Sequence, residues 1–291
     1  MPPKPTKQNE ILHLLAKYGV MSSRTVWELL DRKISYPGVR QHLNSLERRK
    51  LIVRPTGLIG GYPIHFWMLS RESDAFSRIS AITGFTEAEL KQKKMRYTHF
   101  PHEDLCTLFQ FSIERSSRGL KVLRGKDTRY FHLPKHLLSE RVQQNGYCPD
   151  LCIGVPCSEG AIGGEPKFYR WVAVEIDRSY RSAIRLASRL NIYSRHTSFC
   201  GVLYFMPSES TAAKLHKIYA NRKAKDSVRI SGTKEFFLAT ATVQKSPFDP
   251  SSLMLQLSDV ELSLSAWLAI FAVVEPHKRD AFVKSIPDGV I

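Results

Sequence analysis

Two short segments that carry carboxylates constrain the fold of this chain more than any other feature. The first ends in Tyr147-Cys-Pro-Asp150, and the second reads Val174-Glu175-Ile176-Asp177. Both predict β-strands, and because side chains alternate between the two faces of a strand, Glu175 and Asp177 are expected on one face. Carboxylate oxygens that converge from neighbouring strands are the ligands that Mg²⁺ or Mn²⁺ prefers. We therefore expect Asp150, Glu175 and Asp177 to form a site for a divalent metal ion.

The charge of the chain indicates what kind of partner it has. Among 291 residues, 43 are Lys or Arg and 27 are Asp or Glu, which gives a formal net charge of +16. A surplus of this size favours polyanions, because each phosphate that is neutralised releases condensed counterions. The N-terminal sequence lacks the apolar core of a signal peptide, and the apolar runs are too short to span a bilayer. We expect a cytoplasmic protein, without a membrane partner, that binds double-stranded DNA and keeps its five cysteines reduced.

The first 70 residues predict a winged helix-turn-helix domain. Apolar side chains at helical spacing predict one helix that ends at Gly19, a second capped by Ser22 or Ser23, and a third that follows a break at residues 33–35. Two predicted strands follow, separated by a glycine-rich turn. Three helices and a β-hairpin in this order are typical of the winged helix, so residues 1–70 are expected to bind DNA.

The third helix has a polar face suited to a major groove. Its expected DNA contacts are Arg40, Gln41, Asn44 and Arg48. These side chain types bind base edges and phosphates. Two alternatives remain open, namely a small helical bundle with a solvated basic face, and a winged helix that contacts proteins.

The rest of the chain predicts an α/β (α+β) domain. Residues 71–99 are polar and are expected to form a linker. Residues 100–245 predict a helix, strands, a helix, a strand, a helix and a strand, an order that implies a mixed sheet with helices on both faces. Residues 246–291 are expected to form a C-terminal helical extension.

That order of elements, with the acidic residues where they lie, resembles the PD-(D/E)xK nuclease superfamily and its restriction-endonuclease-like fold. The resemblance makes Asp150 the acidic residue of the PD element and Glu175 that of the (D/E)xK element. Asp177 stands where the superfamily has its lysine. The resemblance implies metal-dependent DNA endonuclease activity, with Asp177 as third ligand or as general base.

An arginine stripe follows the second acidic strand. Its members are spaced three, four and four residues apart and are Arg178, Arg181, Arg185 and Arg189. This spacing places them on one face of a helix. Arginine stays protonated and binds phosphate oxygens well, so we expect the stripe to hold a DNA strand. The alternative is a solvated helix face.

A narrower resemblance extends over residues 8–206. The predicted winged helix, His102, Asp150, the segment Glu175-Ile-Asp177-Arg178-Ser179 and Tyr193 are similar to the plasmid replication-relaxation proteins and the MobC-type mobilisation relaxases. The resemblance implies sequence-specific binding at an origin of transfer or replication and nicking of one strand with Mg²⁺ or Mn²⁺. It also implies relaxosome or replication partners, and adds His102 and Arg178 to the catalytic residues. Whether Tyr180 or Tyr193 attacks DNA covalently or only packs stays open.

Two other functions are compatible with the same sequence. The missing lysine favours a DNA-binding replication or transcription regulator whose nuclease fold is degenerate and not catalytic. An end-cleaving nuclease subunit of a transposon is the third possibility, and it would require transposition proteins as partners.

Overall fold

The computed structural model describes eleven segments of the chain. They are residues 6–59, 62–92, 99–116, 119–124, 148–156, 169–177, 182–196, 199–226, 236–242, 254–257 and 260–273. The chain divides into two compact units, Met1–Phe111 and Ser112–Ile291, so the boundary falls within helix α6 (Phe100–Ser116). Both units combine helices and strands, which confirms the predicted α/β class.

The first unit begins with three capped helices, α1 (Lys7–Tyr18), α2 (Ser23–Leu29) and α3 (Tyr36–Arg48). The side chains of Thr6, Ser22 and Ser35 each accept a backbone N–H of the first turn, which satisfies a donor that the helix leaves unpaired. Gly19 follows α1 with φ of 93°, a conformation that glycine adopts without strain. These boundaries confirm the three helices predicted from the sequence.

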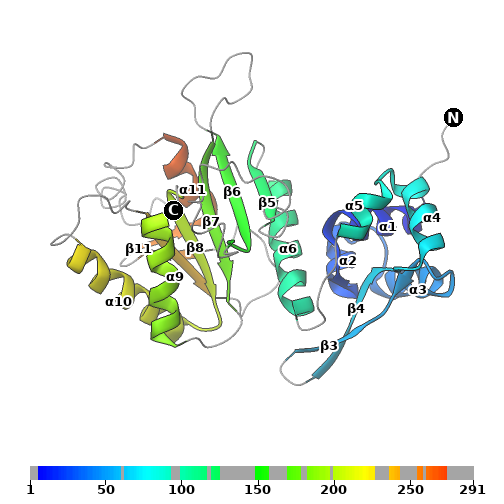
Figure 1. The fold of residues 1–291 in the computed structure, drawn as a ribbon, viewed down its shortest axis with the longest axis horizontal. Helices are drawn as coiled ribbons and strands as arrows, with labels where there is room; N and C mark the ends of the chain where they lie inside the picture. Colours follow the sequence, from blue (N-terminus) through cyan, green and yellow to red (C-terminus); the bar gives the residue numbers. More distant parts are fainter. Residues whose placement is uncertain are drawn as a thin grey trace, which may run out of the picture. The chain divides into compact units, whose positions relative to one another are not determined.

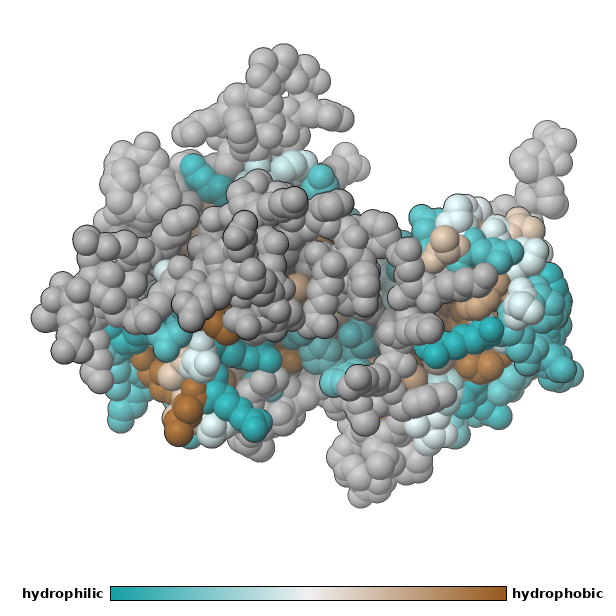
Figure 2. Space-filling model, viewed as in Figure 1, coloured by the Kyte–Doolittle hydropathy of each residue, from teal (hydrophilic) through white to brown (hydrophobic). Residues whose placement is uncertain are grey.

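An antiparallel sheet completes the winged helix. Its strands are β1 (Met21–Ser22), β2 (Ile52–Val53), β3 (Thr56–Ile59) and β4 (Tyr62–Leu69). Strand β4 pairs with each of the other three. Figure 1 shows β3 and β4 extending past the helices as the wing. In the space-filling view, apolar residues of this unit reach the surface in separate patches among hydrophilic ones (Figure 2).

Residues 71–99 were expected to form a linker, but most of this segment folds into the first unit. It contains α4 (Ser73–Thr83) and α5 (Glu87–Gln92). Ala75, Phe76, Ile79 and Leu90 are buried in the same core as the buried faces of α1, α2 and α3. The helical spacing of Ala75, Phe76 and Ile79, followed by Gly84 as C-cap, is a local signal for this helix.

The second unit is built on a seven-stranded sheet with the order β11-β10-β9-β8-β7-β6-β5. The strands are β5 (Lys121–Arg124), β6 (Leu151–Pro156), β7 (Tyr169–Ile176), β8 (Gly201–Met206), β9 (Phe237–Thr242), β10 (Met254–Leu257) and β11 (Val260–Ser263). The pairs β7–β8 and β8–β9 are parallel, and the other four pairs are antiparallel. This is the mixed sheet predicted for this part of the chain.

Helices cover both faces of the sheet. On one face, α9 (Ala183–His196) and α10 (Glu209–Asp226) pack on a cluster that includes Trp171, Ala173 and Val202 (Figure 1). Helix α11 (Leu264–Val273) covers the opposite face, where Phe271 stacks edge-on against Phe237. A methyl group at Gly201 would lie 2.6 Å from the Phe271 ring, so this close approach requires glycine.

The C-terminal region differs from the expected helical extension. Helix α11 lies where a helix was predicted, but β10 and β11 precede it and continue the sheet beyond residue 245. The extension is therefore part of the second unit.

Candidate nucleic-acid interface and carboxylate site

The polar face of α3 lies at the surface of the first unit. Arg40, Gln41, Asn44 and Arg48 are all exposed. None of these side chains forms a hydrogen bond or ion pair with another residue in the part of the chain that the structure describes. The opposite face of α3 is fully buried through Val39, Leu43 and Leu46. The four predicted DNA contacts are therefore presented together to solvent on a helix that is fixed from behind.

Both ends of α3 are held by local contacts. Before the helix, Trp27 Nε1 donates to the carbonyl of Ile34 at 2.8 Å, and the Ser35 hydroxyl accepts the N–H of Gly38 at 3.2 Å. After it, Lys50 N–H donates to Glu47 O at 2.8 Å and Leu51 N–H to Leu46 O at 3.1 Å. These last two bonds form a Schellman motif, in which Lys50 has φ of 57°. The position of the exposed face is thus set at both ends.

Two exposed apolar side chains of the first unit were not predicted from the sequence. Tyr36 begins α3 and is 39% exposed, and Val53 in β2 is 40% exposed. The Tyr36 ring packs edge-on against Trp27, with the ring centroids 5.9 Å apart. The place of this aromatic residue at the start of a predicted helix, next to Pro37, was the available signal.

In the second unit, Asp150 and Glu175 lie opposite one another on neighbouring strands. Leu151 pairs with Val174 in the β6–β7 ladder, and the residues beyond this pair are Asp150 and Glu175. The Asp150 carboxylate accepts the backbone N–H of Ile176 at 2.7 Å. The predicted proximity of these two carboxylates is therefore present in the structure.

Glu175 is engaged by two side chains of α9. Arg189 Nη1 lies 2.5 Å from one carboxylate oxygen, and the Tyr193 hydroxyl donates to the other. Glu175 and Tyr193 are each 1% exposed. Tyr193 also packs against Phe199 and Phe236. Tyr193 therefore supports Glu175, and its buried hydroxyl is not exposed to a DNA phosphate in this conformation.

The described residues do not group into the expected three-carboxylate metal site. Asp177 follows β7, is 1% exposed and donates its N–H to Phe205 O at 2.8 Å. Within the described segments, no three His, Cys, Asp or Glu side chains form a group that could hold a metal ion. Both oxygens of Glu175 already accept hydrogen bonds, so the expected three-carboxylate site is not formed in this arrangement.

Cysteines lie beside the carboxylates. Cys152 is buried, and burial raises the pKa of its thiol well above the ordinary value, with smaller contributions from Cys148, Glu175 and Asp150. A raised pKa keeps the thiol protonated and chemically inert. The four cysteines that the structure describes, Cys106, Cys148, Cys152 and Cys200, are not joined by disulfide bonds.

The remaining predicted site residues have different positions. Arg185 is exposed on α9, whereas Arg189 of the same stripe is bound to Glu175. His102 belongs to α6 in the first unit, where its Nδ1 lies 3.8 Å from Cys106 Sγ. Tyr147, Arg178, Ser179, Tyr180 and Arg181 lie outside the described residues.

A scan against protein-family models gave no match, and neither did searches of curated proteins and of solved structures. The fold itself defines the class, an α/β protein with a winged helix in its first unit and a mixed sheet flanked by helices in its second. No helix in the described segments combines the length and apolar character needed to cross a bilayer.

Proposed function

We propose that this protein binds double-stranded DNA in a sequence-specific manner and reads it with helix α3. The observation that carries the proposal is the exposed face of Arg40, Gln41, Asn44 and Arg48 on a helix fixed at both ends. The arginines match phosphates and guanine edges, and the amides match adenine edges. The net charge of +16 supports the same partner.

The biological setting of the proposal rests on resemblance. The winged helix together with Asp150, Glu175-Ile-Asp177 and Tyr193 is similar to the replication-relaxation and MobC-type proteins. We therefore place the function in plasmid or mobile-element mobilisation or replication, with other proteins of those assemblies as partners.

The test of DNA binding is the affinity of the full chain for duplex DNA, measured by fluorescence anisotropy. Arg48→Ala should weaken binding about tenfold, since it removes a charged contact worth roughly 1–3 kcal/mol. Lys17→Ala, which removes an exposed lysine of α1 outside this face, is the matched control and should change little. Equal effects of the two substitutions would contradict the role of α3.

A second candidate function is cleavage of a phosphodiester bond by the second unit. It is favoured by the position of Asp150 opposite Glu175 and by the Arg189 guanidinium beside them. Arg189 supplies a cation where the sequence has no lysine, and a cation stabilises a pentavalent phosphorus. The alternative is a regulator in which Glu175, Arg189 and Tyr193 are purely structural.

Supercoiled plasmid incubated with Mg²⁺ or Mn²⁺ separates these two alternatives. Conversion to open circles by the wild type, but not by Glu175→Gln, would support a nickase. Linear products would support a double-strand or transposition nuclease. Undamaged plasmid under conditions in which the protein binds DNA would establish the regulator.

A further inference from the structure

The first unit contains a pocket on the side of α1 that contacts the end of α2 and α4. Its volume is about 720 Å³, and its apolar floor includes Leu14, Leu29 and Ile82. Small-molecule sites typically have volumes of roughly 300–1,000 Å³, with apolar walls and a few polar groups that converge. The size and the lining of this pocket both fit that description.

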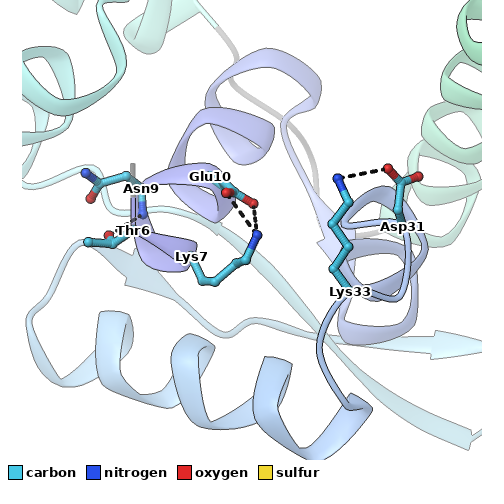
Figure 3. A network of polar contacts seen from close by, with 6 residues as sticks. All are labelled: Thr6, Lys7, Asn9, Glu10, Asp31 and Lys33. Atoms are coloured by element: carbon cyan, nitrogen blue, oxygen red, sulfur yellow. Dashed lines mark hydrogen bonds and ion pairs between the residues drawn. The ribbon is translucent and has the colours of Figure 1, made fainter. Parts of the chain in front are cut away.

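The charged groups around the pocket come from two ion pairs. Figure 3 shows Glu10 bonded to Lys7 on α1, and Lys33 close to Asp31 in the turn before α3. The distances are 2.8 Å for the first pair and 3.4 Å for the second. Glu10, Asp31 and Lys33 line the pocket, whereas Lys7 does not. The lining therefore contains two carboxylates and one ammonium group.

These charged groups favour a ligand with a positive charge. The side chains of Glu10 and Asp31 are 34% and 33% exposed, and ion pairs with this much solvent are weak. A cationic group in the pocket can thus replace a lysine as partner at little cost.

The pocket also touches the segment that positions α3. Asp31 and Arg32 have left-handed backbone conformations, with φ of 57° and 55°. Arg32 is held by two hydrogen bonds of 2.9 Å to Glu28. A ligand that contacts Asp31 would bias this turn and, through it, the start of α3. Ligand binding and DNA binding would then be linked reciprocally.

We propose that this pocket binds a small organic cation with an apolar body, and that its occupation changes the affinity of α3 for DNA. The second half of the proposal rests on the proposed function, whereas the first half does not.

The binding test uses the full chain with methyl-labelled Ile, Leu and Val, followed by NMR. The probe is 2-phenylethylamine, and 3-phenylpropionate is the control with the same ring and the opposite charge. The amine should shift the methyl signals of Leu14, Leu29 and Ile82 in a saturable manner, and the carboxylate should bind at least tenfold more weakly. No shift, or equal shifts by both probes, would overturn the proposal.

Two variants localise the binding. Ala81 is an exposed residue that lines the pocket, so Ala81→Trp should fill the pocket and weaken amine binding at least tenfold. Ala88→Trp, at an exposed position of α5 outside the lining, should leave it unchanged. Undiminished binding to the Ala81→Trp variant would overturn the assignment of the site.

The coupling is tested by DNA affinity with and without saturating amine. The wild type should show a change of at least threefold, and the Ala81→Trp variant none. An unchanged affinity of the wild type would overturn the coupling, while the NMR result would still decide the pocket. A chain that binds no DNA at all would contradict the proposed function and the coupling together, and again leave the pocket to the NMR result.

Discussion

Among single residues, Arg189 has the clearest structural role, because it neutralises a buried carboxylate. Glu175 has 2% of its side chain exposed and lies 2.5 Å from the guanidinium. Arg189→Ala should lower the free energy of unfolding by about 3 kcal/mol, since it leaves a buried charge without its cation. Urea denaturation measures this loss.

Two further variants test the assignment. Arg185→Ala removes an exposed arginine one turn earlier on α9 and should change the free energy of unfolding by less than about 0.5 kcal/mol. Adding Glu175→Gln to Arg189→Ala should recover part of the loss, because the pair is coupled. Purely additive effects would contradict the ion pair.

The buried thiol of Cys152 should make the free energy of unfolding depend on pH. Burial, with the nearby Cys148, Glu175 and Asp150, raises the pKa of its thiol in the folded state. The folded state then holds the proton more tightly, so the stabilisation is complete below the ordinary cysteine pKa of about 8.5 and is lost as the pH rises through the folded pKa. Above about pH 8.5, the unfolding free energy should fall more steeply in the wild type than in the Cys152→Ala variant. Parallel curves would show that Cys152 is not responsible.

At the scale of elements, the end of α3 offers a stabilising substitution. Lys50 adopts φ of 57° in the Schellman motif, and glycine adopts this conformation without strain. Lys50→Gly should raise the free energy of unfolding by up to about 1 kcal/mol. Arg49→Gly is the comparison, because Arg49 has φ of −79° and donates to Gln8 at 2.7 Å, so glycine there should lower the free energy of unfolding. Thermal denaturation of both variants tests the motif, and a loss of stability in Lys50→Gly would contradict it.

The contact between β8 and α11 predicts the opposite effect. A methyl group at Gly201 would lie 2.6 Å from the Phe271 ring, which is fully buried. Gly201→Ala should therefore cost roughly 1–3 kcal/mol through overpacking. Phe271→Leu should relieve part of that cost in the double variant, as measured by chemical denaturation. No relief would mean that the two residues do not meet.

The elements also show what the sequence could predict. The helices α1, α2 and α3 were predictable because their caps and apolar spacing are local signals, such as Ser22 and Ser35. Helix α4 was missed although it carries local signals of the same kind, namely Phe76 and Ile79 at helical spacing and Gly84 as C-cap. Strands β10 and β11 were missed although they pair as a hairpin with only two residues between them, which is a local signal. Only the pairing of β10 with β9 depends on a distant part of the chain.

The candidate site was predictable only in part. Asp150 and Glu175 were expected to converge from two neighbouring strands, and the register of β6 and β7 agrees. Their partners could not be predicted, since the way α9 crosses the sheet decides that Arg189 and Tyr193 reach Glu175. Exposure on α3 was predictable because the apolar face of that helix identifies the opposite face.

At the scale of the whole molecule, the proposed function assigns different parts to the two units. In the first unit, Arg40, Gln41, Asn44 and Arg48 have no partner in the described part of the chain, and they form the face that we propose for DNA. In the second, Glu175 is occupied by Arg189 and Tyr193. DNA recognition is therefore the central claim, and cleavage would additionally require Glu175 to exchange these partners.

Selection of bound duplexes from a random DNA library tests the central claim most directly. The wild type should enrich a defined sequence, and the Gln41→Ala and Asn44→Ala variants should lose preference at one or two positions while keeping the rest, because each amide reads its own base edge. Enrichment of no sequence by the wild type, or of the same sequence by all three proteins, would contradict recognition by α3.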